Sequence, residues 1–341
     1  MKAEATIDKT LGGRPLGGML VTSILVLLAA LAASLAFGAK EVTLHELWMA
    51  MSTSVGGGDT VTLIRDIRLP RIAAALLVGA ALSVSGAIMQ GVTRNPLADP
   101  GLLGVTSGAN AALACTLAIV PSIGYMGIFA ACFAGAAAGA LLAFGLGAAT
   151  GSGLSSMQLV LSGAAVSALL SAIAEGVALH FKLSKDVSMW TSGGLIGASW
   201  EQVRMTTPVI LAALAVALLL SRPLTLLSLN EEASVGLGVR TIKVKAALYG
   251  LAVVLTGAAV ALAGNLAFLG LMIPHIVRRF AGNDYRIVVP LSAVGGAALM
   301  LLADLLGRTL NLPYEVPVAA IVAMMGLPFF LLIVRKGAKP L

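Results

Sequence analysis

Few residues of this chain have the types and spacing that catalysis or metal binding requires. The histidines His45, His180 and His275 lie far apart, and neither Cys115 nor Cys132 has a partner at the spacing of a zinc site. The sequence has no G-x-x-x-x-G-K-[ST] phosphate loop and no evident nucleophile–base pair. We therefore expect no catalytic residue, cofactor or metal, and a protein that moves a molecule rather than transforming it.

Charged residues gather instead at the ends of apolar segments. Arg68 and Arg71 precede the second long apolar segment, and Arg308 follows the ninth. Asp304 lies four residues before Arg308, so the two can share a helix face and form an ion pair. Arginines in such places can anchor a helix at the lipid head groups, or bind carboxylates of a partner protein through bidentate pairs.

A proline-containing break follows the second apolar segment. Its sequence is Arg-Asn-Pro-Leu-Ala-Asp-Pro-Gly-Leu-Leu-Gly, from Arg94 to Gly104. Pro96 and Pro100 interrupt backbone hydrogen bonding, so we expect two helices separated here. Irregular backbone at membrane depth is tolerated only where protein or a water-filled cavity surrounds it.

The elements that carry these residues must be membrane helices. Of the 341 residues, 59% are apolar and only 11% are charged, against about 25% in an ordinary soluble domain. This composition excludes a soluble globular enzyme, a disordered chain and a disulfide scaffold. The net charge of +7 fits the excess of Lys and Arg in cytoplasmic loops, so it does not require nucleic acid as a partner.

The apolar segments number ten, each long enough or nearly long enough to cross about 30 Å of hydrocarbon. The first is too long for the apolar region of a signal peptide, and Gly pairs such as Gly104/Gly108 and Gly135/Gly139 favour close helix packing. With both termini inside, the inner segments hold 14 basic residues and the outer segments 8. The expected spans are 16–37, 72–90, 102–120, 126–149, 157–179, 203–220, 246–263, 266–277, 287–306 and 316–334.

Taken together, the motifs resemble those of the FecCD-type permeases, the membrane subunits of ABC importers for iron-siderophores, haem and vitamin B12. The resemblance covers nearly the whole chain and implies a single all-α permease domain over 1–341 with the type II importer fold. It also implies a dimer with a second copy or a paralogue, two ATPase subunits and an extracytoplasmic substrate-binding protein. The motifs that carry it are Arg68-Leu-Pro-Arg71, Gly86–Gln90, Arg94–Gly104, Trp190–Trp200, Gly270–Arg279, Asp284-Tyr-Arg286, and Ala303–Arg308 with Glu315-Val-Pro317.

The resemblance also implies roles for individual residues. Arg68, Arg71 and Arg308 would dock the binding protein, with Asp304 orienting Arg308. A cytoplasmic coupling segment, 222–240, would contact the ATPase. Its central residues are Asn230, Glu231, Glu232, Ala233, Ser234, Gly236, Leu237 and Gly238, and the inner gate would comprise Asn95, Leu97, Ser156 and Met157.

One carboxylate, Glu175, lies within the fifth expected span, where it could face the pathway or lie near the outer surface. His275 is expected to be structural. The function implied is uptake of a ferric siderophore across the bacterial inner membrane, with both termini cytoplasmic and ATP hydrolysed by a separate subunit. Haem or vitamin B12 remains open as substrate, and an ion-coupled secondary transporter is a remoter alternative.

Overall fold

The computed structural model describes residues 16–38, 42–52, 58–149, 156–229, 236 and 241–335. Within these ranges all of the regular secondary structure is helical, which confirms the predicted all-α class. The helices are α2 (Leu16–Ala36), α3 (Leu44–Ser52), α4 (Asp59–Leu63), α5 (Leu69–Thr93), α6 (Val105–Ile119), α7 (Tyr125–Ala149), α8 (Ser156–His180), α9 (Ser184–Thr191), α10 (Trp200–Leu219), α11 (Ser221–Leu229), α13 (Thr241–Ala263), α14 (Leu269–Ala281), α15 (Tyr285–Thr309) and α16 (Val318–Arg335).

Eight helical stretches in the described residues are long and apolar enough to cross a membrane. Each overlaps one of the ten expected spans, and the two remaining spans correspond to the shorter helices α6 and α14. The second span starts earlier than expected, because the α4 helix continues through a π-helical turn, Ile64–Arg68, directly into α5. Pro70 does not interrupt this start, since it lies in the first turn of α5.

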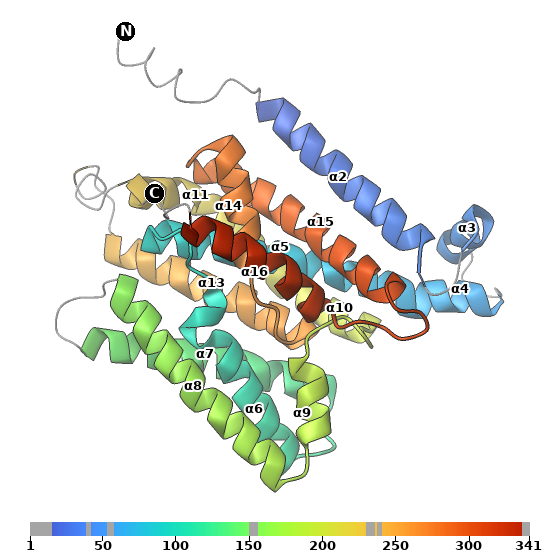
Figure 1. Cartoon of the computed structure of the whole chain (residues 1–341), viewed down its shortest axis with the longest axis horizontal. Helices are drawn as coiled ribbons and strands as arrows, with labels where there is room; N and C mark the ends of the chain where they lie inside the picture. Colours follow the sequence, from blue (N-terminus) through green and yellow to red (C-terminus); the bar gives the residue numbers. More distant parts are fainter. Residues whose placement is uncertain are drawn as a thin grey trace.

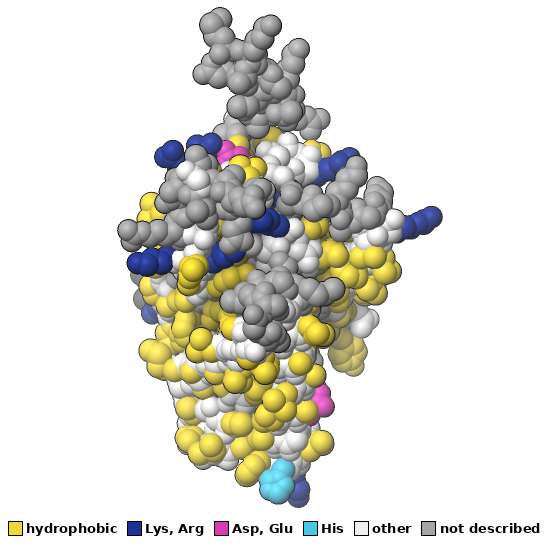
Figure 2. Space-filling model, turned by 90° about the vertical axis from the view of Figure 1, so that its left-hand side faces the viewer, with side chains coloured by type: hydrophobic (Ala, Val, Ile, Leu, Met, Phe, Trp, Pro, Cys, Tyr) yellow, Lys and Arg dark blue, Asp and Glu magenta, His cyan; other side chains and the backbone are white. Residues whose placement is uncertain are grey.

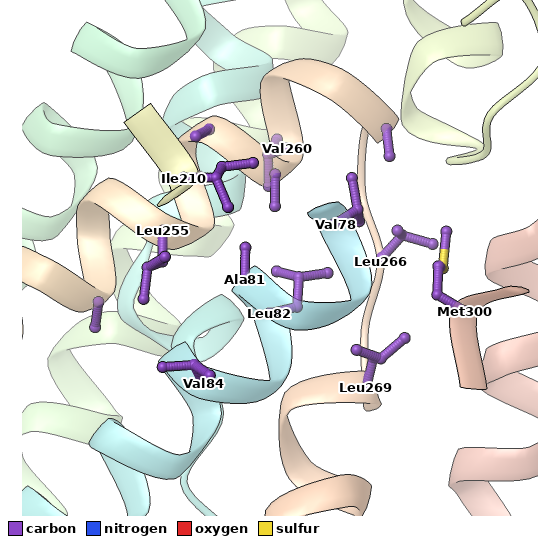
Figure 3. Close-up of a cluster of buried hydrophobic side chains, with 14 of the residues drawn as sticks. Val78, Ala81, Leu82, Val84, Ile210, Leu255, Val260, Leu266, Leu269 and Met300 are labelled. Atoms are coloured by element: carbon purple, nitrogen blue, oxygen red, sulfur yellow. The ribbon is translucent and has the colours of Figure 1, made fainter. Parts of the chain in front are cut away.

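The central helix of the bundle is α5. Figure 3 shows side chains from α10, α13, α14 and α15 converging on Val78, Ala81 and Leu82 of α5, and all of the labelled side chains are buried. Close approach depends on glycine: a Cβ at Gly79 would overlap the backbone of α15, and a Cβ at Gly86 would overlap the backbone of α14. Because lipid tails are as apolar as the helix surfaces, the hydrophobic effect does not drive membrane helices together, and such close van der Waals packing is a main cause of their association.

A second close contact joins α6 to α7. A Cβ at Gly108 would overlap the backbone at Gly135, and Gly139 faces Gly104 in the same way. The predicted packing role of these two glycine pairs is therefore confirmed. This contact holds α6 beside α7 immediately after the proline-containing break, whose Asp99 side chain accepts a hydrogen bond from the Gly101 N–H at 2.8 Å.

The bundle has two ends, which we name by the short helices that lie there. The α4 end carries α3, α4 and the end of α15, and lies to the right in Figure 1. The α11 end carries α11, the end of α14 and the start of α15, and lies to the left. Figure 2 views the α11 end and shows Lys and Arg side chains spread over its upper part; exposed basic residues near this end include Arg222, Lys243, Arg279, Arg286 and Arg335.

Candidate functional site

At the α4 end, arginines and carboxylates form a buried ion-pair cluster. We call Arg71, Asp304, Arg308 and Glu315 the arginine–carboxylate cluster. Arg71 Nε donates to Asp304 Oδ1 at 2.8 Å, and Arg71 Nη1 donates to both carboxylate oxygens of Glu315 at 3.0 and 2.8 Å. Arg308 Nε lies 3.1 Å from Asp304 Oδ2, so the expected i,i+4 pair is present. Asp304 thus lies between two guanidinium groups.

Two arginines of this end also hold α2. Arg308 Nη2 donates to Ser34 Oγ at 2.7 Å, and Arg68 Nη1 donates to the Leu35 carbonyl at 2.7 Å. Arg308 Nη2 also donates to the Ser34 carbonyl at 3.4 Å. Because the last turn of a helix leaves carbonyl groups without intrahelical donors, the two arginines supply donors to the end of α2. The cluster therefore ties α2, α5, α15 and the α15–α16 connection together.

Burial distinguishes these arginines from a simple surface patch. Arg68, Arg71 and Arg308 are only 4%, 5% and 5% exposed, and Asp304 is fully buried. The Glu315 side chain is 32% exposed and is the part of the cluster nearest to solvent. Sequence reasoning missed Glu315 and Ser34 as partners, since 244 residues separate Arg71 from Glu315 and nothing in their local patterns links them.

At the α11 end a different cluster surrounds a buried arginine. We call it the Gln90–Arg278–Tyr285 cluster. Arg278 Nη2 donates to Gln90 Oε1, and Arg278 Nη1 donates to the Tyr285 hydroxyl at 3.1 Å. Gln90 and Tyr285 are fully buried and Arg278 is 7% exposed. These residues fall in three of the recognised motifs, but the sequence did not single them out.

The start of α15 connects this cluster to α11. Thr225 Oγ1 accepts from the Tyr285 backbone N–H at 2.9 Å and lies 3.2 Å from Asp284 Oδ1. Asp284 also binds Arg286, at 2.7 Å from Oδ2 to Nη2. Hydrogen bonding from Arg286 is the main cause that lowers the pKa of Asp284 below its usual value.

The residues expected at the inner gate lie on the connection after α5 and at the start of α8. Asn95 Oδ1 accepts from the Leu97 backbone N–H at 2.9 Å, which makes a tight turn with both residues half-buried. Ser156 and Met157 begin α8, and their side chains lie outside the described part of the structure. The structure thus gives backbone positions for all of the gate residues and a side-chain hydrogen bond for Asn95.

Most of the coupling residues lie outside the described residues: Asn230, Glu231, Glu232, Ala233, Ser234, Leu237 and Gly238. Gly236 is described; it is helical and exposed. The start of the expected segment 222–240 forms most of α11, whose Leu224 and Leu227 are buried.

Two further residues of the sequence analysis lie on membrane helices. Glu175 is exposed on α8. His275 is half-buried on α14 and packs edge-on against the Phe329 ring, with centroids 5.7 Å apart. No group of His, Cys, Asp and Glu side chains within the described ranges has the arrangement of a metal site.

Comparison with known proteins gives a consistent result. The sequence model of the FecCD transport family matches residues 25–336. The chain is 42% identical to the iron(3+)-hydroxamate import system permease protein FhuB of Bacillus subtilis, over 90% of this chain and 80% of the relative. It is 38% identical to the ferric enterobactin permease protein FepD of Escherichia coli over 93% and 94%, and to the hemin permease protein HmuU of Yersinia pestis over 96% and 98% of the two chains.

Solved structures agree. A metal-chelate type ABC transporter in an inward-facing conformation aligns with a TM-score of 0.81 at 29% identity, covering 94% of this chain and 99% of that one. The PsaBC structure from Streptococcus pneumoniae aligns with a TM-score of 0.60 at 16% identity, covering 84% and 94%, which supports the fold alone. The chain therefore belongs to the FecCD transport family and is a membrane permease of the ABC transporter class.

Proposed function

We propose that this chain is the permease subunit of an ATP-driven importer that carries a ferric siderophore across the inner membrane of a bacterium. The observation that carries the proposal is the family match over residues 25–336, together with eight helices, among the described residues, that are long and apolar enough to cross a membrane. Relatives named for hydroxamate and enterobactin uptake support a siderophore as the substrate. The hemin relative keeps haem as the second candidate, and vitamin B12 is the third.

In this proposal the α11 end is cytoplasmic. Its exposed basic residues support that orientation, because cytoplasmic loops carry an excess of Lys and Arg. The start of α2 and the end of α16 lie toward the same end in Figure 1, so both termini would be cytoplasmic. The segment 222–240, including Gly236, would contact the ATPase, of which the dimer would bind two subunits. The connection at Asn95 and Leu97, with Ser156 and Met157, would close the pathway.

The pathway itself would form between this chain and a second copy, or a closely related paralogue. Glu175 is exposed on α8, so it would face either the pathway or the outer surface. ATP would be hydrolysed by the separate ATPase subunits, and selection of the substrate would rest with the extracytoplasmic binding protein. No cofactor or metal of this chain takes part in the proposed transport cycle.

The α4 end would then receive the binding protein. Arg71 and Arg308 are paired within the chain, so a carboxylate of the binding protein would compete with Glu315, the most exposed member of the cluster. One donor supports this role: Arg71 Nη2 is buried and has no hydrogen-bond partner among the described residues. Arg68, the last residue of the π-helical turn before α5, would add positive charge to the docking surface.

Transport in reconstituted vesicles tests the overall function. The chain is co-reconstituted with its ATPase subunit in liposomes, and the binding protein is loaded with a radioactive ferric hydroxamate. We expect uptake that requires ATP and continues when a protonophore removes the proton gradient. Uptake that does not depend on ATP but stops when the protonophore is added would instead establish a secondary transporter.

Docking needs a separate experiment that spares the buried pairs. Glu315→Gln weakens the internal competitor of an incoming carboxylate, so we expect half-maximal stimulation of ATP hydrolysis at a lower concentration of binding protein. Glu201→Gln is the matched control, because Glu201 is an exposed carboxylate in the first turn of α10, near the same end. Equal responses of both variants and the unmodified chain would reject docking at the arginine–carboxylate cluster.

A further inference from the structure

The buried charge of Arg278 has no carboxylate partner among the residues that the structure describes. Both of its side-chain partners, Gln90 and Tyr285, are neutral. Burying a charge without a counter-charge is costly, and this arginine lies in the last turn of α14. The position of the cluster indicates a role for it.

On one side the cluster reaches the proline-containing first half of α14. Pro274 has no backbone N–H, so the Gly270 carbonyl, four residues earlier, lacks its intrahelical donor. Gln90 Nε2 lies 3.3 Å from that carbonyl and 3.2 Å from the carbonyl of Leu271, and donates to both. A single amide side chain of α5 therefore completes the hydrogen bonding of α14 and also accepts from Arg278.

On the other side the cluster reaches α11. The Tyr285 hydroxyl accepts from Arg278, while the Tyr285 backbone N–H donates to Thr225 of α11. A Cβ at Gly91 would lie 2.7 Å from Leu224 Cδ1 and 2.8 Å from Tyr285 Cζ, so the glycine lets α11 and the Tyr285 ring pack against α5. Hydrogen bonds, joined through the Tyr285 and Arg278 side chains, thus connect α11 to the first turn of α14.

We propose that the Gln90–Arg278–Tyr285 cluster is a positioning relay that passes movement of α11 to α14 and α5. This inference rests on the proposed function, in which the segment that follows α11 receives the movement of the ATPase. The relay would shift the proline-containing turn of α14 against α5 each time α11 is displaced. Its residues do not contact substrate; they act through the helices that they join.

The neutral partners suit this role physically. Separating an ion pair in a low-dielectric interior costs much more than exchanging one hydrogen bond for another. Arg278 has several donors, so it can keep one neutral partner while its bond to the other lengthens. A carboxylate in place of Gln90 would fix the arginine in a single arrangement.

The test measures ATP hydrolysis and iron uptake in the same vesicles, with the chain, its ATPase subunit and a binding protein loaded with ferric hydroxamate. We expect Arg278→Met and Gln90→Leu to assemble and hydrolyse ATP while transport per ATP falls about fivefold or more, as for a typical coupling free energy. Tyr285→Phe should have a smaller effect, because its backbone bond to Thr225 remains. Arg278→Lys should assemble normally yet recover the ratio only in part, since an ammonium lacks the guanidinium's fork.

The matched control is Ser85→Ala. Ser85 is a buried polar residue of α5, the helix that carries Gln90. Its hydroxyl lies 2.7 Å from Thr256 Oγ1 of α13, away from α11. We expect Ser85→Ala to leave transport per ATP unchanged. An assembled Arg278→Met complex with an unchanged ratio would overturn the relay.

A distance measurement covers the case in which a variant transports too little iron to measure. Spin labels at the exposed positions Arg279 of α14 and Leu218 of α10 report the movement of α14. We expect ATP to change this distance in the unmodified complex but not in Gln90→Leu, and an equal change in both would overturn the relay. Absence of ATP-dependent uptake by the unmodified complex would instead reject the proposed function itself.

Discussion

The two ends of the bundle bury arginines in opposite ways. In the arginine–carboxylate cluster, Asp304 lies within 3.1 Å of nitrogens from two arginines. In the Gln90–Arg278–Tyr285 cluster, the partners of the arginine within the described part of the chain are all neutral. The first arrangement holds four segments of the chain in one geometry, and the second joins helices through hydrogen bonds that can be exchanged. The difference indicates a rigid α4 end and an α11 end that can move.

The largest effect is expected from Asp304→Ala. The substitution leaves Arg308 buried without a carboxylate and Arg71 with Glu315 alone, so we expect a loss of about 3–5 kcal/mol of stability. Thermal unfolding of the purified chain in detergent measures it as a fall in Tm. Glu201→Ala, at an exposed carboxylate near the same end, provides the comparison. A fall no larger than that of the control would mean that the α4 end is not held by these ion pairs.

A smaller effect is expected from Arg278→Met. It removes a costly buried charge but leaves Gln90 Oε1 and the Tyr285 hydroxyl without their donor, a loss of about 1–3 kcal/mol. The same thermal unfolding experiment measures it. The comparison between the two ends fails if this variant loses as much stability as Asp304→Ala.

Glu315→Gln should change stability still less. The carboxylate is partly exposed, and pairs of this kind contribute about 0–1 kcal/mol. Because Arg71 keeps its bond to Asp304, we expect nearly the same Tm as for the unmodified chain. A loss comparable to that of Asp304→Ala would place Glu315 within the rigid part of the cluster rather than at its displaceable rim.

The smallest effect concerns pH and the loop before α15. The folded chain holds the pKa of Asp284 below that of the unfolded chain, so ionised Asp284 stabilises the folded state above about pH 4. This stabilisation is lost as the pH falls through the folded-state pKa. We therefore expect the Tm difference between the unmodified chain and Asp284→Asn to shrink on going from about pH 7 to about pH 3. A difference that stays constant would contradict the Arg286 interaction.

Much of the fold follows from local sequence, because a helix is a local structure. Apolar segments of about 20 residues predicted the long spans, and glycines four apart predicted sites of close helix packing, though not which helices would meet there. The second span was predicted to start at residue 72, but the continuous helix starts at Asp59. The charged residues Arg65, Asp66 and Arg68 interrupt the apolar pattern, so the pattern did not indicate a helix before Pro70. The short helix α14 covers Leu269–Ala281, whereas the expected span was 266–277, and its start follows Phe268 in a left-handed conformation that no local pattern reveals.

The candidate sites divide in the same way. The Asp304–Arg308 pair could be predicted because four residues on one helix fix its geometry. The partners from distant segments could not: Glu315 and Ser34 meet the arginines only because α5, α15 and α2 pack together. Likewise, Gln90 meets Arg278 across 188 residues of sequence.

The sequence by itself determined that this chain is a helical membrane protein, where its spans lie, and which family its motifs resemble. These properties depend on composition and short-range spacing, which act within single helices. Only the tertiary structure decided the partners of two other arginines: two carboxylates for Arg71 at the α4 end, and a glutamine and a tyrosine for Arg278 at the α11 end. Hydrogen bonds and ion pairs act over a few ångströms, so their partners are set by which helices pack together and not by their order along the chain.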